Sequence, residues 1–355
     1  MNDPQICPRC NKRYGETSLR FCTVDGAGLL SEEAVERIGV VLGDRYELQK
    51  ILRRGTRCVV YSGQNTVFGK PVAIKVLPAS LSEPGEAAGQ FVSQAQLAAM
   101  IQHPNVIDVI DTGRTPDGAL YQVLELLEGG TLEHTLQRDE QIPLFDAVNI
   151  IRQLTHALEA VHDAGLLHLN LQPRSVFLVP QQGRRQTIQR DRATGRFSVQ
   201  REDNFLFVKL KGFGRALELG EDGTIEANIS GLDRDALLFQ APERTTGVVD
   251  HRSDIYSLGL LLYLMVTGEK AFDGPPVPGA TPIPPGWRVP DLELPRDTNS
   301  TIMRCLECEP GQRFQSVDEL LPALDDCFTD RVFLRNAHRL EGAMESGLVP
   351  DDQIK

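Results

Sequence analysis

The first part of the main domain alternates apolar and polar residues in short runs. The runs are YELQKIL at 46–52, CVVYSGQ at 58–64 and PVAIKVL at 71–77, with turn-forming residues between them. Apolar residues at every second position are typical of strands that bury one face, so each run predicts a β-strand. Together they predict a small β-sheet.

Beyond His103 the apolar residues recur with helical spacing. The longest stretches are FDAVNIIRQLTHALEAVHDAG at 145–165 and RSDIYSLGLLLYLMVTG at 252–268, each ending in glycine. They predict two long helices, the second with Ser253 as its N-cap. The Pro- and Gly-dense stretch 272–290 predicts an ordered surface loop without regular structure. The fold class is therefore α+β, with a small β-rich lobe followed by a larger helical lobe.

The chain ends differ in composition from the main domain, which we place at 46–328. A length of 355 residues allows one large domain with a small appendage. Residues 1–30 are rich in Cys and Gly and form a separate small module, and 31–45 form a linker. Residues 329–355 include the amphipathic sequence RVFLRNAHRLEGAMES and predict a helical tail.

Composition and charge narrow the range of partners. Hydrophobic residues make up 41% of the chain and charged residues 24%, as in ordinary globular proteins. The formal net charge of -12 argues against general affinity for nucleic acid or anionic lipid, so we expect a protein partner. The polar N-terminus does not resemble a signal peptide, and no apolar run reaches the ~18 residues of a membrane span. We therefore expect a cytoplasmic protein.

The N-terminal cysteines have the spacing of a metal site. Cys7 and Cys10 form a CxxC pair, and Cys22 and Asp25 follow with the same spacing, which is similar to a truncated zinc ribbon. A carboxylate is an acceptable but less soft zinc ligand than a fourth thiolate. The alternative is a metal-free hairpin of Gly turns, but such a small module has almost no core without a staple.

Five short motifs follow one another in a fixed order over the main domain. This order resembles the bacterial type of Ser/Thr protein kinase, and it implies a two-lobed protein-kinase-like fold. Two single residues, Asp254 and Arg313, continue the resemblance. The motifs are VAIK ending in Lys75, HPNVI from His103, GLLHLNLQP around His168, KGFG around Phe213, and APE ending in Glu243.

The resemblance also shows which reactive groups are missing. Where the family has the catalytic-loop Asp that accepts the substrate proton, this chain has Asn170. Gln172 and Ser175 replace the loop Lys and the magnesium-binding Asn, and Gly212 replaces the Asp of the DFG motif. The resemblance therefore implies no catalytic base and no magnesium site.

The nucleotide side is partly degraded as well. The glycine-rich loop reads RRGTRCVV, which keeps Gly55 but has Arg53 and Cys58 beside it. Lys75 is present, but its Glu partner in active kinases aligns with Gln94, which cannot form an ion pair. We expect ATP to bind weakly or not at all, with Gly55 and Lys75 as vestigial contacts.

Structural landmarks of the family remain in place. In the family, His168 and Phe213 belong to a packed hydrophobic column, Asp254 fastens the catalytic loop, and Glu243 pairs with Arg313. We expect all five to serve stability, because the chemistry around them is gone.

A chain that keeps these landmarks and loses the reactive groups is predicted to be an inactive kinase homologue, a pseudokinase. Its expected role is that of a signalling scaffold or regulator acting through protein contacts. Two alternatives stay open, a nucleotide-sensing switch that binds ATP without magnesium and an atypical active Ser/Thr kinase.

An insertion at 180–204 separates VFLV from FLFVKL and predicts a projecting hairpin. It carries six arginines, which could dock an acidic partner, but a solvated hairpin is the interpretation that we favour from the sequence. The arginines are Arg184, Arg185, Arg190, Arg192, Arg196 and Arg201.

Overall fold

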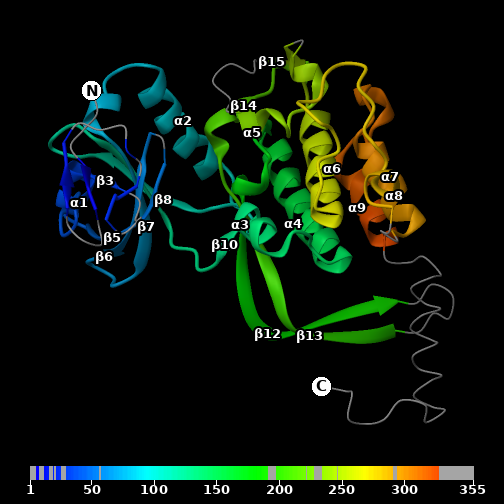
Figure 1. Cartoon of the computed structure of the whole chain (residues 1–355), viewed down its shortest axis with the longest axis horizontal. Coiled ribbons are helices and arrows are strands. Elements are labelled where there is room, and N and C mark those ends of the chain that lie inside the picture. Colours follow the sequence, from blue (N-terminus) through cyan, green and yellow to red (C-terminus); the bar gives the residue numbers. More distant parts are fainter. Residues whose placement is uncertain are drawn as a thin grey trace, which may run out of the picture. The chain divides into compact units, whose positions relative to one another are not determined.

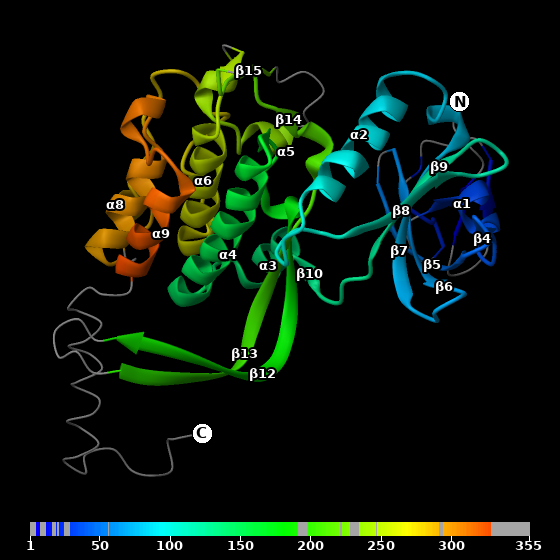
Figure 2. The same cartoon turned by 180° about the vertical axis from the view of Figure 1, so that it is seen from behind.

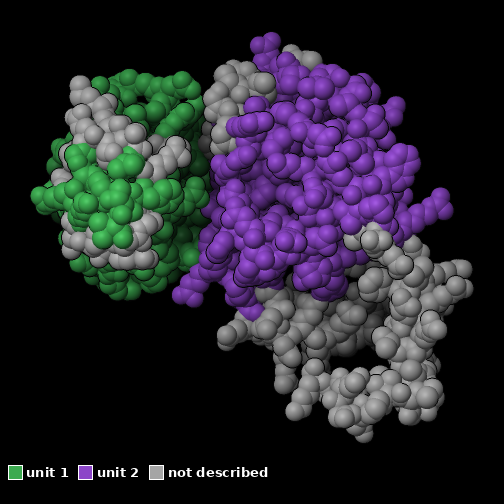
Figure 3. All heavy atoms as spheres, viewed as in Figure 1, with its two compact units in different colours: residues 1–100, 107–127 green, residues 101–106, 128–355 purple. Residues whose placement is uncertain are grey.

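The computed structural model describes residues 5–7, 12–15, 19, 21–24, 29–55, 57–190, 197–220, 222–227, 234–245, 247–290 and 294–327. The chain divides into two compact units, coloured separately in Figure 3. Unit 1 comprises Met1–Met100 and Ile107–Leu127, and unit 2 comprises Ile101–Val106 and Glu128–Lys355. The predicted tail helix at 329–355 lies outside the described residues.

Unit 1 is built on a six-stranded sheet with the strand order β4-β5-β6-β7-β9-β8, in which all neighbours are antiparallel. The three runs that predicted strands form β5, β6 and β7, so these predictions are confirmed. In β6 every second residue is buried, as the alternation required. The strands are β4 (Val41–Leu42), β5 (Tyr46–Arg54), β6 (Val59–Asn65), β7 (Pro71–Leu77), β8 (Val109–Arg114) and β9 (Leu120–Glu125).

Helices cover both faces of this sheet. The successive residues Val76 and Leu77 of β7 point to opposite faces. Leu77 packs with Phe91 of helix α2 (Glu86–Met100), whereas Val76 belongs to a core that includes Ala34 of helix α1 (Glu32–Glu36). A short 3-10 helix, Ala79–Leu81, follows β7.

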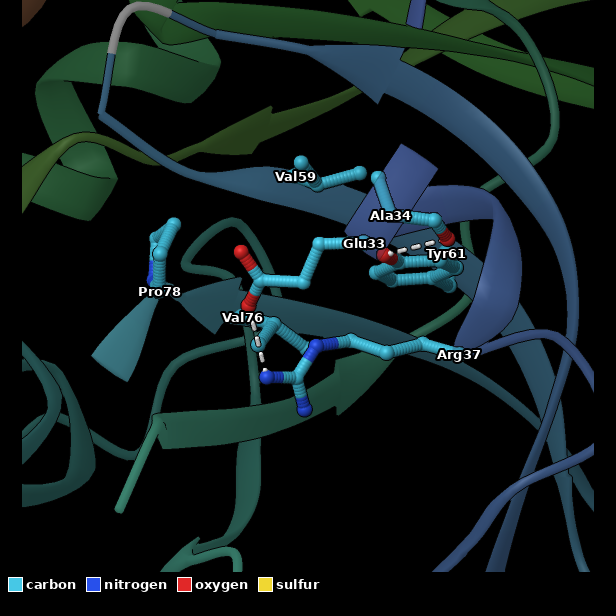
Figure 4. A pocket seen from close by; sticks show the side chains of 7 residues that line it. All are labelled: Glu33, Ala34, Arg37, Val59, Tyr61, Val76 and Pro78. Carbon is cyan, nitrogen blue, oxygen red and sulfur yellow. Dashed lines mark hydrogen bonds and ion pairs between the residues drawn. The ribbon is translucent and has the colours of Figure 1, made fainter. Parts of the chain in front are cut away.

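Helix α1 is fastened to its face of the sheet by specific contacts (Figure 4). The hydroxyl of Tyr61 on β6 donates to the carbonyl of Ala34 at 2.9 Å, and the Arg37 guanidinium pairs with Glu33 at 2.8 Å. The same guanidinium also pairs with Asp117 at 2.5 Å. A small pocket between helix and sheet is lined by Glu33, Ala34, Arg37, Val59, Tyr61, Val76 and Pro78. The segment 31–45, expected as a linker, therefore contributes a helix, a strand and core residues to unit 1.

The described part of the N-terminal module is a three-stranded sheet in the order β2-β1-β3. Its small core consists of Cys7, Cys22 and Leu29, with Tyr14 packed against them. The strands are β1 (Gln5–Ile6), β2 (Arg13–Tyr14) and β3 (Leu30–Ser31).

Unit 2 is mainly helical, and its core lies between α4 and α6. Helix α4 buries a stripe that includes Ile151, Leu154 and Leu158, which is the predicted amphipathic pattern. Helix α6 is buried along nearly its whole length and ends at Gly268, whose φ of 70° suits glycine. The helices are α3 (Leu132–Asp139), α4 (Leu144–Asp163), α5 (Arg234–Leu237), α6 (Arg252–Thr267), α7 (Pro285–Arg288), α8 (Arg296–Cys305) and α9 (Val317–Asp326).

Two local predictions in unit 2 were wrong. The N-cap of α6 is His251, and Ser253 lies in the first turn, where its hydroxyl donates to the Glu243 carboxylate at 2.6 Å. The loop 272–290 contains the single-turn helix α7, which begins at Pro285 because proline at the first helical position loses no hydrogen bond.

The strands of unit 2 are few, but one pair is long. Strands β12 and β13 pair antiparallel from Val176↔Leu210 to Arg190↔Phe197, with one register shift between Gln182 and Arg185. Figures 1 and 2 show this ribbon reaching away from the helices, and the insertion 180–204 lies within it. The strands are β10 (Gly130–Thr131), β11 (Leu166–Leu167), β12 (Val176–Arg190), β13 (Phe197–Leu210), β14 (Leu217–Glu218), β15 (Ile225–Glu226) and β16 (Val248–Val249).

The described part of unit 2 also contains four 3-10 helices, at Pro173–Ser175, Phe213–Arg215, Pro242–Thr245 and Pro310–Gln312. No helix in the described part of the chain is both long and apolar enough to span a membrane.

Candidate active site

The catalytic-loop segment, residues 168–175, begins directly after β11, and its backbone is hydrogen-bonded to the Asp254 carboxylate of α6. One oxygen of Asp254 accepts the backbone N–H of His168 at 2.9 Å, and the other accepts that of Leu169 at 2.8 Å. Leu169 has a φ of 52°, which is unfavourable for a leucine, and its carbonyl also accepts a hydrogen bond from the buried Arg244. These three contacts hold the loop in a strained conformation.

Asp254 remains ionised although it is buried. Burial raises its pKa, but the hydrogen bond from His162 at 3.1 Å and the N–H of His168 outweigh burial, so its pKa lies below the usual value. Asp254 thus serves the loop as a charged acceptor, in the structural role expected of it.

His168 is a neutral core residue. Burial lowers its pKa to about 4. Its Nδ1 accepts the backbone N–H of Asn170 at 3.3 Å, so the proton resides on Nε2, which lies 3.3 Å from the carbonyl of Lys211. Its ring meets Phe213 edge to face with centroids 4.9 Å apart, which is the packing expected of this pair.

Asn170, which the sequence predicts to stand at the position of the family's catalytic base, has both ends of its amide engaged. Its Nδ2 donates to the carbonyl of Gly212 at 3.0 Å, and its Oδ1 accepts from Nε2 of Gln172 at 2.8 Å. An amide oxygen is not basic at neutral pH, and this one already has a donor. Asn170 therefore joins the catalytic loop to the segment around Gly212.

Gln172 and Ser175 close the loop on themselves. The Ser175 hydroxyl donates to the Gln172 carbonyl at 2.8 Å and accepts the Gln172 N–H at 3.0 Å. Both residues are buried. The four degenerate positions therefore lie together, and none of their side chains carries a charge.

Gly212 has a conformation that disfavours any side chain. Its φ is 98°, and a Cβ added to it would lie 3.3 Å from Nδ2 of Asn170 and 3.4 Å from Cβ of Ser175. The chain continues from Gly212 into the 3-10 helix that begins with Phe213. The backbone here is compatible with glycine but would strain an aspartate.

Glu243 and Arg313 form the ion pair expected from the sequence. The two Arg313–Glu243 bonds measure 2.7 and 2.8 Å, and three further bonds reach the carbonyls of Glu307, Arg252 and Cys308. The guanidinium also lies 4.7 Å from the centroid of the Tyr256 ring. The Arg313 side chain is fully buried, and each of its five N–H groups donates a hydrogen bond. Arg313 therefore holds the segment around Glu243 to the residues near 307–313.

The nucleotide positions lie in unit 1. Nζ of Lys75, on β7, donates to Oε1 of Gln94, on α2, at 2.8 Å, and lies 5.1 Å from the centroid of the Phe91 ring. Burial lowers the pKa of Lys75. The positive charge of Arg53 lowers the pKa of Lys75 as well. Arg53 and Lys75 both pair with Val60 of β6, so their side chains lie on the same face of the sheet. Among the described residues, no carboxylate forms a salt bridge with Lys75.

The turn between β5 and β6 is compact. The N–H of Gly55 donates to the carbonyl of Cys58 at 2.8 Å, and burial raises the pKa of the Cys58 thiol. Arg53 and Cys58 stand beside Gly55 where the resemblance predicts further glycines of the phosphate-binding loop.

The zinc prediction is only partly within the described chain. Cys7 and Cys22 lie in the same small core, whereas Cys10 and Asp25 are outside the described residues. In the described ranges, no three His, Cys, Asp or Glu side chains are grouped to hold a metal ion.

Sequence reasoning missed Arg244 and the contact of Gln172 with Asn170. Arg244 follows the APE motif directly, but nothing in the sequence indicates that it would be buried beneath Leu169. The link from Gln172 to Asn170 depends on the turn of the loop, which spacing alone does not predict.

Unit 1 combines an antiparallel sheet with helix α2, and unit 2 is mainly helical and carries the ordered motifs. This combination is typical of the protein kinase fold. The protein kinase domain family matches residues 46–280, and the chain belongs to that family. It is 32% identical to the serine/threonine-protein kinase PknB of Mycolicibacterium smegmatis over 79% of this chain and 42% of that protein. It is 30% identical to a probable serine/threonine-protein kinase of Clostridium perfringens, over 81% of this chain and 39% of the relative. The chain thus spans about two fifths of the length of these bacterial relatives.

A solved structure shows the same fold. The kinase domain of Mycobacterium tuberculosis PknI aligns with a TM-score of 0.58 and 22% identity, covering 82% of this chain and 98% of that domain. The expected α+β kinase-like architecture is therefore confirmed.

Proposed function

We propose that this member of the kinase family is a pseudokinase that acts as a non-catalytic scaffold or regulator through protein contacts. The observation that carries the proposal is the Asn170 amide, which is bonded at both ends where a kinase requires a base. Losing a general base typically lowers the rate by about 10²- to 10⁴-fold.

The surroundings of Asn170 support the same proposal. Phosphoryl transfer in kinases relies on magnesium ions held by the DFG Asp and the catalytic-loop Asn. Here those positions hold Gly212, which has no side chain, and Ser175, whose hydroxyl is engaged with the Gln172 backbone. A hard cation prefers carboxylate oxygens, and these positions offer none.

The proposed partners are proteins. Two parts of the chain are candidates for the contact, the hairpin at 180–204 and the N-terminal module at 1–30. The hairpin has six arginines against three acidic residues, Asp191, Glu202 and Asp203, in a chain of net charge -12. This local excess favours an acidic partner surface.

One observation favours a second candidate function, a nucleotide-sensing switch. Lys75 is a half-buried cation whose nearest polar partner is the neutral amide of Gln94. A phosphate group could supply the missing negative charge without magnesium.

The test combines nucleotide binding with catalysis. Purified full-length chain is titrated with ATP, with and without Mg²⁺, while its melting temperature is followed, and phosphotransfer is assayed with radiolabelled ATP. Lys75→Ala is compared with Lys70→Ala, because Lys70 is exposed on the β6–β7 turn. The scaffold proposal expects no transfer and no shift in melting temperature.

Other outcomes decide between the alternatives. A magnesium-independent shift that disappears in Lys75→Ala but persists in Lys70→Ala would establish the nucleotide-sensing switch. Phosphotransfer by the wild-type chain would overturn both proposals and establish an atypical active kinase.

A further inference from the structure

The sulfur of Cys22 receives two hydrogen bonds. The Tyr14 hydroxyl donates to Sγ at 3.1 Å, and the backbone N–H of Val24 donates at 3.3 Å. A neutral thiol is a weak acceptor, whereas a thiolate or a metal-bound sulfur attracts such donors. Two donors directed at one buried sulfur are the arrangement found around metal-bound cysteines.

Tyr14 is itself oriented for this role. Its oxygen accepts the backbone N–H of Thr23 at 2.9 Å, so the hydroxyl proton is left to donate. The Thr23 hydroxyl lies 3.1 Å from the same oxygen. Tyr14 therefore behaves as an outer-shell donor to the Cys22 sulfur.

Cys7 lies in the same core as Cys22 although 15 positions separate them. Cys7 is fully buried, and its N–H donates to the Lys12 carbonyl at 2.9 Å, which closes the turn between β1 and β2. Besides these two cysteines, the described core contains only Leu29 with Tyr14 against it. So small a core needs a staple, and thiolates are preferred ligands of Zn²⁺.

This core is joined to the sheet that carries the nucleotide turn. Nη1 of Arg54 donates to the carbonyl of Leu29 at 3.0 Å. Arg54 is the last residue of β5, and Gly55 begins the turn that its N–H closes on Cys58. This hydrogen bond connects the cysteine core to the strand that leads into the nucleotide turn.

We propose that the N-terminal module binds one Zn²⁺ through the thiolates of Cys7 and Cys22, with Tyr14 as a positioning residue for Cys22. Zinc binding orders the turn at 55–58 through the contact of Arg54 with Leu29. Zinc binding by the module would thus stabilise the nucleotide turn of unit 1. This role does not depend on whether the chain is a pseudokinase.

The first test measures zinc affinity of the full-length chain by competition with a chromophoric chelator, with the metal content checked by mass spectrometry. Tyr14→Phe is compared with Tyr46→Phe, which removes a hydroxyl bonded to Asp111 elsewhere in unit 1. We expect about 10- to 100-fold weaker zinc binding for Tyr14→Phe, unchanged binding for Tyr46→Phe and loss of binding for Cys22→Ser. A wild-type chain without zinc, or equal affinities for the two tyrosine variants, would overturn the proposal.

The second test measures amide hydrogen exchange at Gly55 with zinc and with chelator. In the wild-type chain, zinc should slow this exchange by about tenfold. In Arg54→Ala, one zinc should still bind, but exchange at Gly55 should no longer depend on it. If zinc leaves Gly55 exchange unchanged in the wild-type chain, the proposed link to the nucleotide turn is wrong.

Discussion

Replacing Gln94 with glutamate exchanges one NH₂ group for an oxygen beside Lys75. The Lys75 Nζ to Gln94 Oε1 distance is 2.8 Å, so the glutamate would form an ion pair without moving either side chain. The pair would restore the charge compensation that Lys75 lacks within the described part of unit 1. We therefore expect Gln94→Glu to stabilise the protein and to raise the pKa of Lys75.

The magnitude follows from the distance and the burial. Two unit charges at 2.8 Å attract by about 6 kcal/mol at an effective dielectric constant of ~20. Desolvating the new carboxylate offsets most of that attraction, and hydrogen bonds to charged groups contribute about 1.5–3 kcal/mol net. We expect Gln94→Glu to raise the free energy of unfolding by about 1–3 kcal/mol.

The assay is urea denaturation followed by circular dichroism, with Gln90→Glu as the matched control. Gln90 lies one turn earlier on α2 and accepts a bond from Arg57 at 3.1 Å in an exposed position. Exposed pairs contribute little, and Glu86 repels a charge at 90, so the control should change stability by less than about 0.5 kcal/mol.

If Gln94→Glu is no more stable than Gln90→Glu, Lys75 is neutral or already compensated by another anion. That result would refute the description of Lys75 as an uncompensated cation and would remove the main argument for nucleotide sensing.

Three further predictions concern unit 2. Arg313→Met should lower the free energy of unfolding by about 3–5 kcal/mol, because it leaves a carboxylate without its buried partner, whereas Arg304→Met, at a half-exposed position, should cost no more than about 1 kcal/mol. Gly212→Ala should cost about 1–3 kcal/mol, because its φ is 98°, while Gly89→Ala in helix α2 should stabilise by about 0.5–1 kcal/mol. Because the folded pKa of His168 is about 4, below its usual 6.5, the unfolded chain binds more protons between these values. Stability should therefore fall by about 3 kcal/mol as the pH drops from 6.5 to 4, and His168→Gln should lack this contribution.

Denaturation curves decide each of these cases. Equal losses in the two arginine variants would contradict the anchoring role of Arg313. A neutral Gly212→Ala would show that the backbone at this position is not held in its left-handed conformation. A wild-type pH profile that is parallel to that of His168→Gln would mean that His168 is not a buried neutral histidine.

The sequence predicted the framework of the kinase fold because its signals are local and periodic. The strands at 46–52, 58–64 and 71–77 follow from alternation, and the long helices from their spacing. The pairing of Glu243 with Arg313 came from the family resemblance, since 70 residues separate the two in the chain.

Features that depend on tertiary packing were harder to predict. The segment 31–45 has a short helix whose stability comes from Ala34 packing against the sheet, and no helical period is visible in five residues. Ser253 has the chemistry of an N-cap, but the nearby Glu243 carboxylate is a stronger acceptor for its hydroxyl. The bonds of Asn170 depend on the turn of its own loop, which brings Gln172 to it, and on the position of the segment around Gly212.

The long ribbon of β12 and β13 makes the chain tolerant of changes in length. Its pairing starts at Val176↔Leu210, beside the catalytic loop, and continues through one register shift, between Gln182 and Arg185, to Arg190↔Phe197. Because side chains alternate with a period of two, removing two residues from each strand near the tip keeps every remaining residue on its original face. Evolution or an experimenter can therefore lengthen, shorten or tag this ribbon while the paired residues at its base keep their register.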